Sequence, residues 1–251
     1  MKFYKALDSI KLKKYSEVDK KQFALSFFSK SEFKSSKIFD DELKKKVSKF
    51  FADEKRSSLF LSKELTGLKG DFLVLRDFNK NKSEYKKYAW MKGLFANLDK
   101  YAVKNAVIYA DTSHLFKDDN FLFDLAKTAE KVSYRYTDTN PNTKKELILK
   151  NVSLAVENAT AAQKRVVELG YNVGSGANTA RNLGDRPANH ATPAYIAKAV
   201  KGLAKDIGGF SVEILEEKDM KKLGMGCLLS VSRGSIEPAK LVTMQYKGGK
   251  K

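Results

Sequence analysis

The sequence is poor in the side chains that most often bind metals or act as nucleophiles. Cys227 is the only cysteine among the 251 residues, so neither a disulfide nor a cysteine-based metal site can form within the chain. This cysteine usage suits a reducing compartment. His114 and His190 are the only histidines. Metal sites need several converging His, Cys, Asp or Glu side chains, and the sequence shows no such constellation.

Long hydrophobic runs are also missing. No apolar stretch approaches the ~18 residues that a membrane-spanning helix needs. Residues 1–14 are rich in lysine and have no continuous apolar core, which excludes a secretory signal peptide. We therefore expect a cytoplasmic protein with no membrane partner.

Acidic residues are too few to balance the basic ones. The chain carries 48 Lys and Arg against 30 Asp and Glu, which gives a formal net charge of +18. A basic surface that binds DNA is one explanation. However, the lysines are scattered and no DNA- or RNA-binding motif accompanies them, which favours ordinary solvated faces. A DNA-binding or regulatory module stays open as the alternative function.

Hydrophobic residues make up 42% of the chain, and in residues 1–157 their pattern alternates between short strands and helices. Such alternation is typical of a mostly parallel sheet with helices on its faces, so this part is predicted to be an α/β domain. Strands are predicted at residues 22–28, 58–61, 71–76, 105–110 and 147–156. Helices are predicted from Asp40 or Asp41, over residues 83–101, and from Asp118 or Asp119, with a turn at residues 140–142.

A long helix is predicted from about residue 158 to residue 182. Thr160 and Gln163 have the spacing of an N-terminal capping box. The apolar residues that share one face, and that we expect to be buried, are Val166, Leu169, Val173, Ala177 and Ala180.

Three glycines interrupt this helix. Gly170, Gly174 and Gly176 each cost up to ~1 kcal/mol relative to alanine in a helix interior. Small residues in a helix usually permit close packing against a neighbouring element, which is the interpretation we adopt. The alternative is a phosphate-binding loop, but no Gly-Lys-Ser/Thr motif follows and the glycines do not open a helix after a strand.

Residues 180–193 form a turn-rich stretch with two prolines, a glycine and two asparagines. Thr192 is placed to cap a helix whose first turn contains Pro193. The predicted apolar stripe of that helix is Ile196, Val200, Leu203 and Ile207, and Gly208-Gly209 end it.

The remaining residues have an incomplete β-α-β pattern. Strands are predicted at residues 210–215, 227–231 and 241–246, with a short helix at residues 217–223. Cys227 would then be buried and inert. Apolar side chains such as Val242 and Met244 would stay uncovered, so we expect poor solubility or self-association.

No arrangement of acids, bases and nucleophiles indicates an active site. Asp111, Ser113 and His114 lie on one loop, whereas the members of a catalytic triad come from separate elements that converge. His190 lies in the turn, where a polar residue is the default. Ordinary solvated positions are expected for the acidic residues Glu213, Glu216 and Glu217.

The turn carries a resemblance to a known family. Residues 180–183 read Ala-Arg-Asn-Leu, residues 187–189 read Pro-Ala-Asn, and Thr192-Pro193 follows. This run resembles the interdomain signature of the leucyl aminopeptidases, a family of cytosolic, hexameric, two-metal enzymes. The Leu-Gly-Met-Gly stretch at residues 223–226 is similar as well. The resemblance is specific from about residue 160 to residue 251, and before that it is architectural.

Three places depart from the usual family pattern. Asn182 replaces the usual Asp, Asp185-Arg186 replaces a more common Asn-Glu pair, and Ala188 stands where proline is frequent. None of these positions is expected to bind metal, so they concern details of the turn rather than the family.

The resemblance implies a hydrolase that releases N-terminal amino acids from peptides. In the family, two divalent ions, Mn²⁺ or Zn²⁺, are held by a lysine and several carboxylates and activate the attacking water. Those ligands lie in a Gly-Lys-Gly motif and an Asn-Thr-Asp-Ala-Glu-Gly-Arg run, and neither occurs in this sequence. Lys250 and Lys251 belong to the loop before the first motif and are not its counterpart.

The resemblance also implies an architecture. Residues 1–157 would form a macro-like mixed sheet with flanking helices, residues 158–182 a linker helix, and residues 183–251 the truncated start of an α/β catalytic domain. Every catalytic position is expected beyond Lys251, so we expect no catalytic, metal-binding or cofactor-binding residue in this chain and no activity of the chain alone. A homo-oligomer, hexameric in the family, is expected of the complete enzyme. A nucleotide-binding role for residues 1–157 is opposed by the lack of a phosphate-binding glycine loop.

Overall fold

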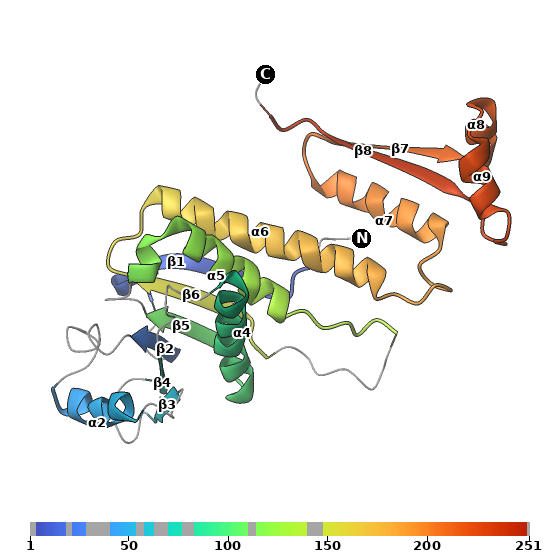
Figure 1. Cartoon of the computed structure of the whole chain (residues 1–251). Coiled ribbons are helices and arrows are strands. Elements are labelled where there is room, and N and C mark those ends of the chain that lie inside the picture. The colour runs from blue at the N-terminus through green and yellow to red at the C-terminus, as the bar shows by residue number, and fades with distance from the viewer. Residues whose placement is uncertain are drawn as a thin grey trace. The chain divides into compact units, whose positions relative to one another are not determined.

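The computed structural model describes residues 4–18, 22–28, 41–53, 58–62, 70–76, 83–109, 114–139 and 148–249 (Figure 1). These residues fall into two compact units. The unit that we call the sheet unit comprises the described parts of Lys5–Arg135 and Lys144–Asn178. The second, which we call the ribbon unit, comprises Tyr4, residues 136–139 and residues 179–249.

Six strands form the sheet of the sheet unit. Their order is β1-β6-β5-β2-β4-β3, and neighbours pair in parallel except for β3, which runs antiparallel to β4. The predicted α/β class with a mostly parallel sheet is therefore confirmed. The strands are β1 (Ser9–Lys14), β2 (Phe23–Phe28), β3 (Ser58–Leu61), β4 (Phe72–Arg76), β5 (Asn105–Tyr109) and β6 (Asn151–Val156).

Sequence reasoning missed β1, which lies in the lysine-rich N-terminal stretch. Ile10 and Leu12 are buried while Lys11 between them is exposed, so the strand does alternate, but over very few residues. The strand predicted over residues 147–156 begins only at Asn151. The predicted turn at residues 140–142 lies outside the described residues.

Helices cover both faces of the sheet (Figure 1). Successive residues of β4 show this: Leu73 belongs to the core cluster formed with α4, α5 and α6, whereas Val74 belongs to the cluster formed with α2. Parallel strands that are buried on both sides are mainly apolar, as β5 (Asn-Ala-Val-Ile-Tyr) is. None of the described helices is long and apolar enough to cross a lipid bilayer. The helices are α2 (Asp41–Ala52), α4 (Glu84–Lys100), α5 (Asp119–Val132) and α6 (Ala161–Gly184), with 3-10 turns η1 (Tyr15–Glu17) and η2 (His114–Lys117).

The long helix α6 begins with the predicted capping box. The backbone N–H of Gln163 donates to Thr160 Oγ1 at 3.1 Å, and the N–H of Thr160 donates to Gln163 Oε1 at 3.4 Å. These two bonds satisfy backbone donors that the first turn would otherwise leave without acceptors.

The buried face of α6 is not the predicted one. Leu169 is 56% exposed and Val173 is 44% exposed, and Ala180 is exposed as well. Both candidate stripes have helical spacing, so periodicity alone could not choose between them. The helix instead buries a stripe of mainly small and polar residues, namely Val167, Gly170, Tyr171, Gly174, Ser175, Asn178 and Asn182.

Two glycines explain this choice, because they let α6 approach the backbone of α5. A Cβ atom on Gly170 would lie 2.3 Å from the carbonyl oxygen of Phe123. A Cβ atom on Gly174 would lie 2.9 Å from the carbonyl oxygen of Lys127. The predicted close-packing role is thus confirmed for Gly170 and Gly174, whereas a Cβ atom on Gly176 would meet nothing within 4 Å.

A buried carboxylate fastens the N-terminal segment to α5 and α6. Glu130 is fully buried, and its Oε1 and Oε2 accept the backbone N–H groups of Ala6 at 2.6 Å and Leu7 at 2.9 Å. Asn178 Nδ2 donates to the Glu130 carbonyl oxygen at 2.8 Å and to Oε1 at 3.2 Å. The Tyr171 hydroxyl donates to the Leu7 carbonyl oxygen at 2.7 Å. This group, the Glu130 clamp, satisfies buried peptide groups just before β1 begins.

Burial raises the pKa of the Glu130 carboxyl, and the hydrogen bonds from Ala6, Leu7 and Asn178 offset part of this rise. Burial also raises the pKa of Tyr171 to about 12. The folded state therefore keeps the Glu130 proton at pH values where the unfolded chain releases it. The stability linked to this proton is fully present below the unfolded value of 4.5 and is lost as the pH rises through the folded value.

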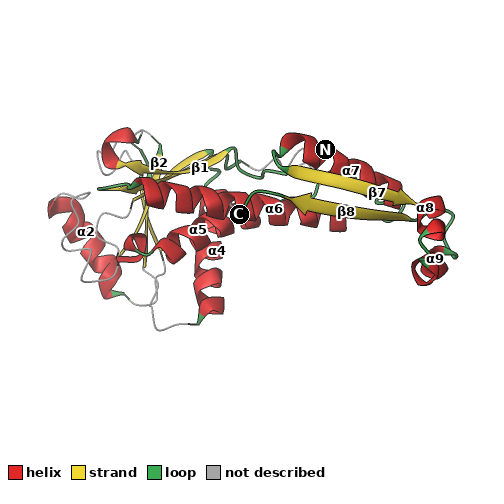
Figure 2. Cartoon of the chain, turned by 90° about the horizontal axis from the view of Figure 1, so that it is seen from above, coloured by secondary structure: helices red, strands yellow, loops and turns green. Residues whose placement is uncertain are grey.

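The ribbon unit is built on an antiparallel pair of strands. β7 and β8 pair from Phe210↔Tyr246 to Glu216↔Lys240. Figure 2 shows α7 lying along the two strands, with α8 and α9 at one end of the pair. The elements are α7 (Pro193–Asp206), β7 (Phe210–Glu216), α8 (Glu217–Lys222), α9 (Gly226–Ser232) and β8 (Lys240–Tyr246).

The start of α7 is as predicted. Thr192 Oγ1 accepts the N–H of Tyr195 at 3.2 Å, and Pro193 occupies the first turn. Val200 is buried on the predicted apolar stripe. Gly209, with φ of +73°, adopts the left-handed conformation that the turn into β7 requires.

Residues 227–231 do not form the predicted strand. They belong to α9, where the Ser230 hydroxyl donates to the Cys227 carbonyl oxygen at 2.7 Å. A short apolar run fits a helix and a strand equally well, which is why the pattern misled the prediction. Cys227 is exposed, so the prediction that it is buried is also wrong.

Replacing Gly174 by alanine should destabilise the sheet unit, because the α5 backbone cannot move aside without disturbing the core. We expect the free energy of unfolding to fall by about 1–3 kcal/mol, as in overpacked cores. Gly176→Ala is the matched control on the same helix, and it should stabilise the chain by up to ~1 kcal/mol. Urea-induced unfolding followed by circular dichroism measures both. Equal effects of the two substitutions would contradict the close approach.

Replacing Glu130 by glutamine should destabilise the chain at acidic pH by about 1–3 kcal/mol, because one buried N–H of the N-terminal segment loses its acceptor. The difference from the wild type should narrow as the pH rises above 4.5, since only the wild type loses stability through this group. Urea-induced unfolding over a series of pH values measures the trend. Glu168→Gln, at an exposed position of α6, is the control and should show no such trend. If the difference in the free energy of unfolding between the two proteins widened as the pH rises, this interpretation of Glu130 would be wrong.

The chain should self-associate through the ribbon unit. Ile236 is 99% exposed, and Val231 and Met244 are exposed large apolar side chains, whereas Val242 is half-buried. Sedimentation equilibrium should give an average mass above 28.2 kDa. Val231→Lys combined with Met244→Lys should lower that mass, and Thr243→Lys, at an exposed position of the same strand as Met244, should not. A monodisperse wild-type monomer would refute the expectation.

Candidate functional site

The turn between α6 and α7 carries the family resemblance, and backbone hydrogen bonds hold it. The N–H of Asp185 donates to the Arg181 carbonyl oxygen at 2.7 Å. The N–H groups of His190 and Ala191 both donate to the Pro187 carbonyl oxygen, at 2.8 and 2.9 Å. His190 itself is exposed. The stretch is thus a compact connection that ends at the Thr192 cap.

Arg186 connects three parts of the ribbon unit. Its Nη2 donates to Asp138 Oδ2 and, at 3.4 Å, to Asn182 Oδ1 near the end of α6. Its guanidinium lies 4.7 Å from the ring centroid of Tyr195 in α7. The side chain is only 12% exposed. We call Arg186, Asp138, Asn182 and Tyr195 the Arg186 cluster.

The two histidines that sequence analysis considered belong to different units. His114 begins η2 in the sheet unit, directly after Asp111 and Ser113, which lie outside the described residues. His190 lies in the ribbon unit. The interpretation of Asp111, Ser113 and His114 therefore still depends on the sequence alone.

The acidic residues of the ribbon unit have local structural partners or face solvent. Glu213 is exposed on β7, opposite Thr243. Glu216 forms an ion pair with Lys240 across the β7–β8 pair. Glu217 Oε1 accepts the N–H of Ala239 at 3.0 Å. Glu216 and Glu217 thus hold the ends of the two strands together, whereas Glu213 faces solvent.

Among the residues that the structure describes, no three His, Cys, Asp or Glu side chains gather in a group that could hold a metal ion. A catalytic two-metal site needs several carboxylates and at least one open coordination position. The described residues therefore do not fit such a site.

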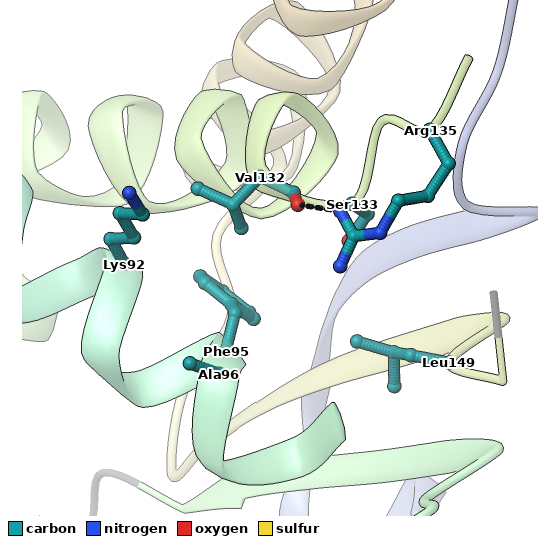
Figure 3. A pocket seen from close by; sticks show the side chains of 7 residues that line it. All are labelled: Lys92, Phe95, Ala96, Val132, Ser133, Arg135 and Leu149. Carbon is teal, nitrogen blue, oxygen red and sulfur yellow. Dashed lines mark hydrogen bonds between the residues drawn. The ribbon is translucent and has the colours of Figure 1, made fainter. Parts of the chain in front are cut away.

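A small cavity of about 200 Å³ lies between α4 and the end of α5 (Figure 3). Phe95, Val132 and Leu149 give it an apolar lining, and Lys92 and Arg135 are its cations. Arg135 Nη1 donates to the carbonyl oxygens of Val132 and Tyr134, both at 2.9 Å. This arginine therefore satisfies carbonyl groups at the C-terminal end of α5. The cavity offers no pair of groups for acid–base catalysis.

Sequence reasoning missed the two buried polar groups that organise the structure. The signal for Glu130 was present: it follows Leu122 and Ala126 at intervals of four residues and so falls on the apolar stripe of α5. Arg186 was seen only as a departure from a family pattern. Its partner Asp138 is 48 residues away in the sequence, and no local pattern reveals such a pair.

Comparisons with known proteins agree with the resemblance in the turn. Residues 178–251 match the model of the cytosol aminopeptidase family, catalytic domain. The chain is 39% identical over 127 residues to a probable cytosol aminopeptidase of Nitrosococcus oceani, covering 49% of this chain and 25% of the relative. It is 32% identical over 207 residues to a probable cytosol aminopeptidase of Aromatoleum aromaticum, covering 79% of this chain and 41% of the relative.

Solved structures show the same fold at low identity. A tomato leucine aminopeptidase mutant matches with a TM-score of 0.73 and 18% identity, over 97% of this chain and 51% of that chain. The apo leucyl aminopeptidase of Trypanosoma cruzi matches with a TM-score of 0.65 and 15% identity, over 95% of this chain and 49% of that chain.

The chain spans about half the length of these solved structures and 41% or less of the two curated relatives. The family model covers the turn, α7 and the β7–β8 pair, and the fold likeness extends over nearly the whole chain. On these matches, the chain belongs to the cytosol aminopeptidase family, the leucyl aminopeptidases.

Proposed function

We propose that this chain supplies the N-terminal α/β domain and the first elements of the catalytic domain of a metal-dependent aminopeptidase. The complete enzyme would release amino acids from the N-termini of peptides. The observation that carries the proposal is the match of residues 178–251 to the catalytic-domain model of the family. The proposed domains are residues 1–157, the linker helix 158–182 and residues 183–251.

The metals of the complete enzyme are proposed to be Mn²⁺ or Zn²⁺. When bound, such ions activate water and polarise the scissile carbonyl. The residues described here do not fit that role. The sequence also lacks the Gly-Lys-Gly and Asn-Thr-Asp-Ala-Glu-Gly-Arg motifs. We therefore propose that the contribution of this chain is to build and orient the framework on which the metal-binding part rests.

The partners and the compartment follow from the same family. We propose peptides with a free N-terminus as substrates, a homo-oligomer, hexameric as expected in the family, and a cytoplasmic location. The names of the relatives, cytosol aminopeptidases, support the enzymatic class and the compartment. The matches lend no support to the alternative, a DNA-binding or regulatory module.

A chimera tests the proposal. Residues 1–251 replace the matching region of the Aromatoleum aromaticum relative. With Mn²⁺ or Zn²⁺, the chimera should hydrolyse a leucine anilide within about tenfold of the rate of the relative, a loss of no more than ~1.4 kcal/mol. The 251-residue chain alone should give no turnover. Turnover by the chain alone, or a folded chimera without activity, would contradict the proposal.

A matched pair of substitutions in the chimera shows whether α7 must be intact. Ala199 is buried and Ala194 is exposed on the same helix. Ala199→Asp should abolish activity because it places an unpaired charge at a buried position of α7. Ala194→Asp, which adds the same group near the helix N-terminus, should leave activity unchanged.

A further inference from the structure

We propose that Arg186 is a positioning residue that fixes the turn between α6 and α7 by pairing with Asp138 and lying against Tyr195. All members of the Arg186 cluster belong to the ribbon unit. The proposal rests on the proposed function only in placing the cluster at the start of the catalytic domain, and its test is independent of activity.

The contacts of Arg186 join stretches that have no regular structure to stretches that do. Asp138 lies in residues 136–139, which form neither helix nor strand, and Arg186 lies in the irregular turn after α6. Asn182 is in the last turns of α6, and Tyr195 is in the first turn of α7. Irregular stretches have no ladder of backbone hydrogen bonds, so side-chain contacts decide their geometry.

The chemistry of arginine suits this role. One planar group donates from Nη2 to two acceptors, and its Cζ lies over the Tyr195 ring, 4.7 Å from the ring centroid. That separation is within the range of cation–π contacts. A lysine ammonium is a compact point charge without a plane, so it could keep the ion pair with Asp138 but could not also reproduce the contact of the guanidinium with the Tyr195 ring.

The contacts of Arg186 should add little to the free energy of unfolding, for two reasons. Its Nε is buried and has no acceptor among the described residues. A buried donor without an acceptor opposes folding. Asp138 is 40% exposed, so water and salt screen its charge. Replacing a buried ion pair by apolar groups is often neutral or stabilising. The cluster therefore specifies a local geometry more than it raises the free energy of unfolding.

Amide hydrogen exchange of the 251-residue chain, read out by mass spectrometry, tests whether Arg186 fixes the local geometry of the turn without raising the overall free energy of unfolding. Arg186→Met and Asp138→Asn should each speed exchange in residues 185–196 by about tenfold or more, because the turn opens locally. The midpoint of thermal unfolding should change by no more than ~2 °C. The double variant should exchange no faster than either single variant, since the two residues act as one unit. Arg186→Lys should give an intermediate rate.

Arg233→Met is the matched control, because Arg233 is an exposed arginine of the same unit. It should leave exchange in residues 185–196 unchanged. Unchanged exchange in Arg186→Met would overturn the proposal. Faster exchange across the whole ribbon unit with a lowered midpoint would also overturn it, since Arg186 would then be an ordinary stabilising residue. Additive effects in the double variant would do so as well. An inactive chimera would refute the proposed function and leave this result untouched.

Discussion

The close approach of α6 to α5 at Gly170 and Gly174 is the contact on which the sheet unit depends. With no side chain between the backbones, Asn178 reaches both the carbonyl oxygen and the carboxylate of Glu130. That carboxylate in turn holds Ala6 and Leu7 in the bend that leads into β1. The first hydrogen-bonded register of the sheet, Ser9↔Asn151, begins two residues later. One backbone contact thus determines where the N-terminal strand enters the sheet.

Local signals allowed most of the fold to be predicted. The caps at Thr160 and Thr192 and the alternation of short apolar strands with amphipathic helices are properties of neighbouring residues, so the sequence displays them directly. The buried face of α6 could not be predicted, because Leu169 and Gly170 lie on two stripes with the same period. The choice between them depends on the shape of α5, which is a tertiary property. The prediction of a strand at residues 227–231 failed for a related reason. This run is too short to show whether its hydrophobic period is that of a helix or a strand.

In the candidate site, too, features formed by neighbouring residues could be predicted, whereas contacts between residues far apart in the sequence could not. The family resemblance in residues 180–193 is contiguous in the sequence, and it was sufficient to identify the family. The polar contacts that shape the structure are not contiguous. Glu130 and Ala6 are 124 residues apart, and Arg186 and Asp138 are 48 residues apart. A single sequence gives no measure of such distances. The only trace of the Glu130 clamp was an acidic residue on an apolar stripe.

A carboxyl group whose pKa is raised by burial is often a sign of a catalytic site, and Glu130 must be judged against that expectation. A general acid or base has to exchange its proton with a substrate or with water in a cleft. Glu130 is fully buried, and its oxygens accept N–H groups of Ala6, Leu7 and Asn178. None of these donors can take up a proton, and Glu130 does not line the cavity between α4 and the end of α5. The raised pKa of Glu130 therefore results from its structural role.

The same reasoning applies to Arg186, whose guanidinium is already occupied by Asp138, Asn182 and Tyr195. Both buried polar centres therefore hold the framework of their own unit together.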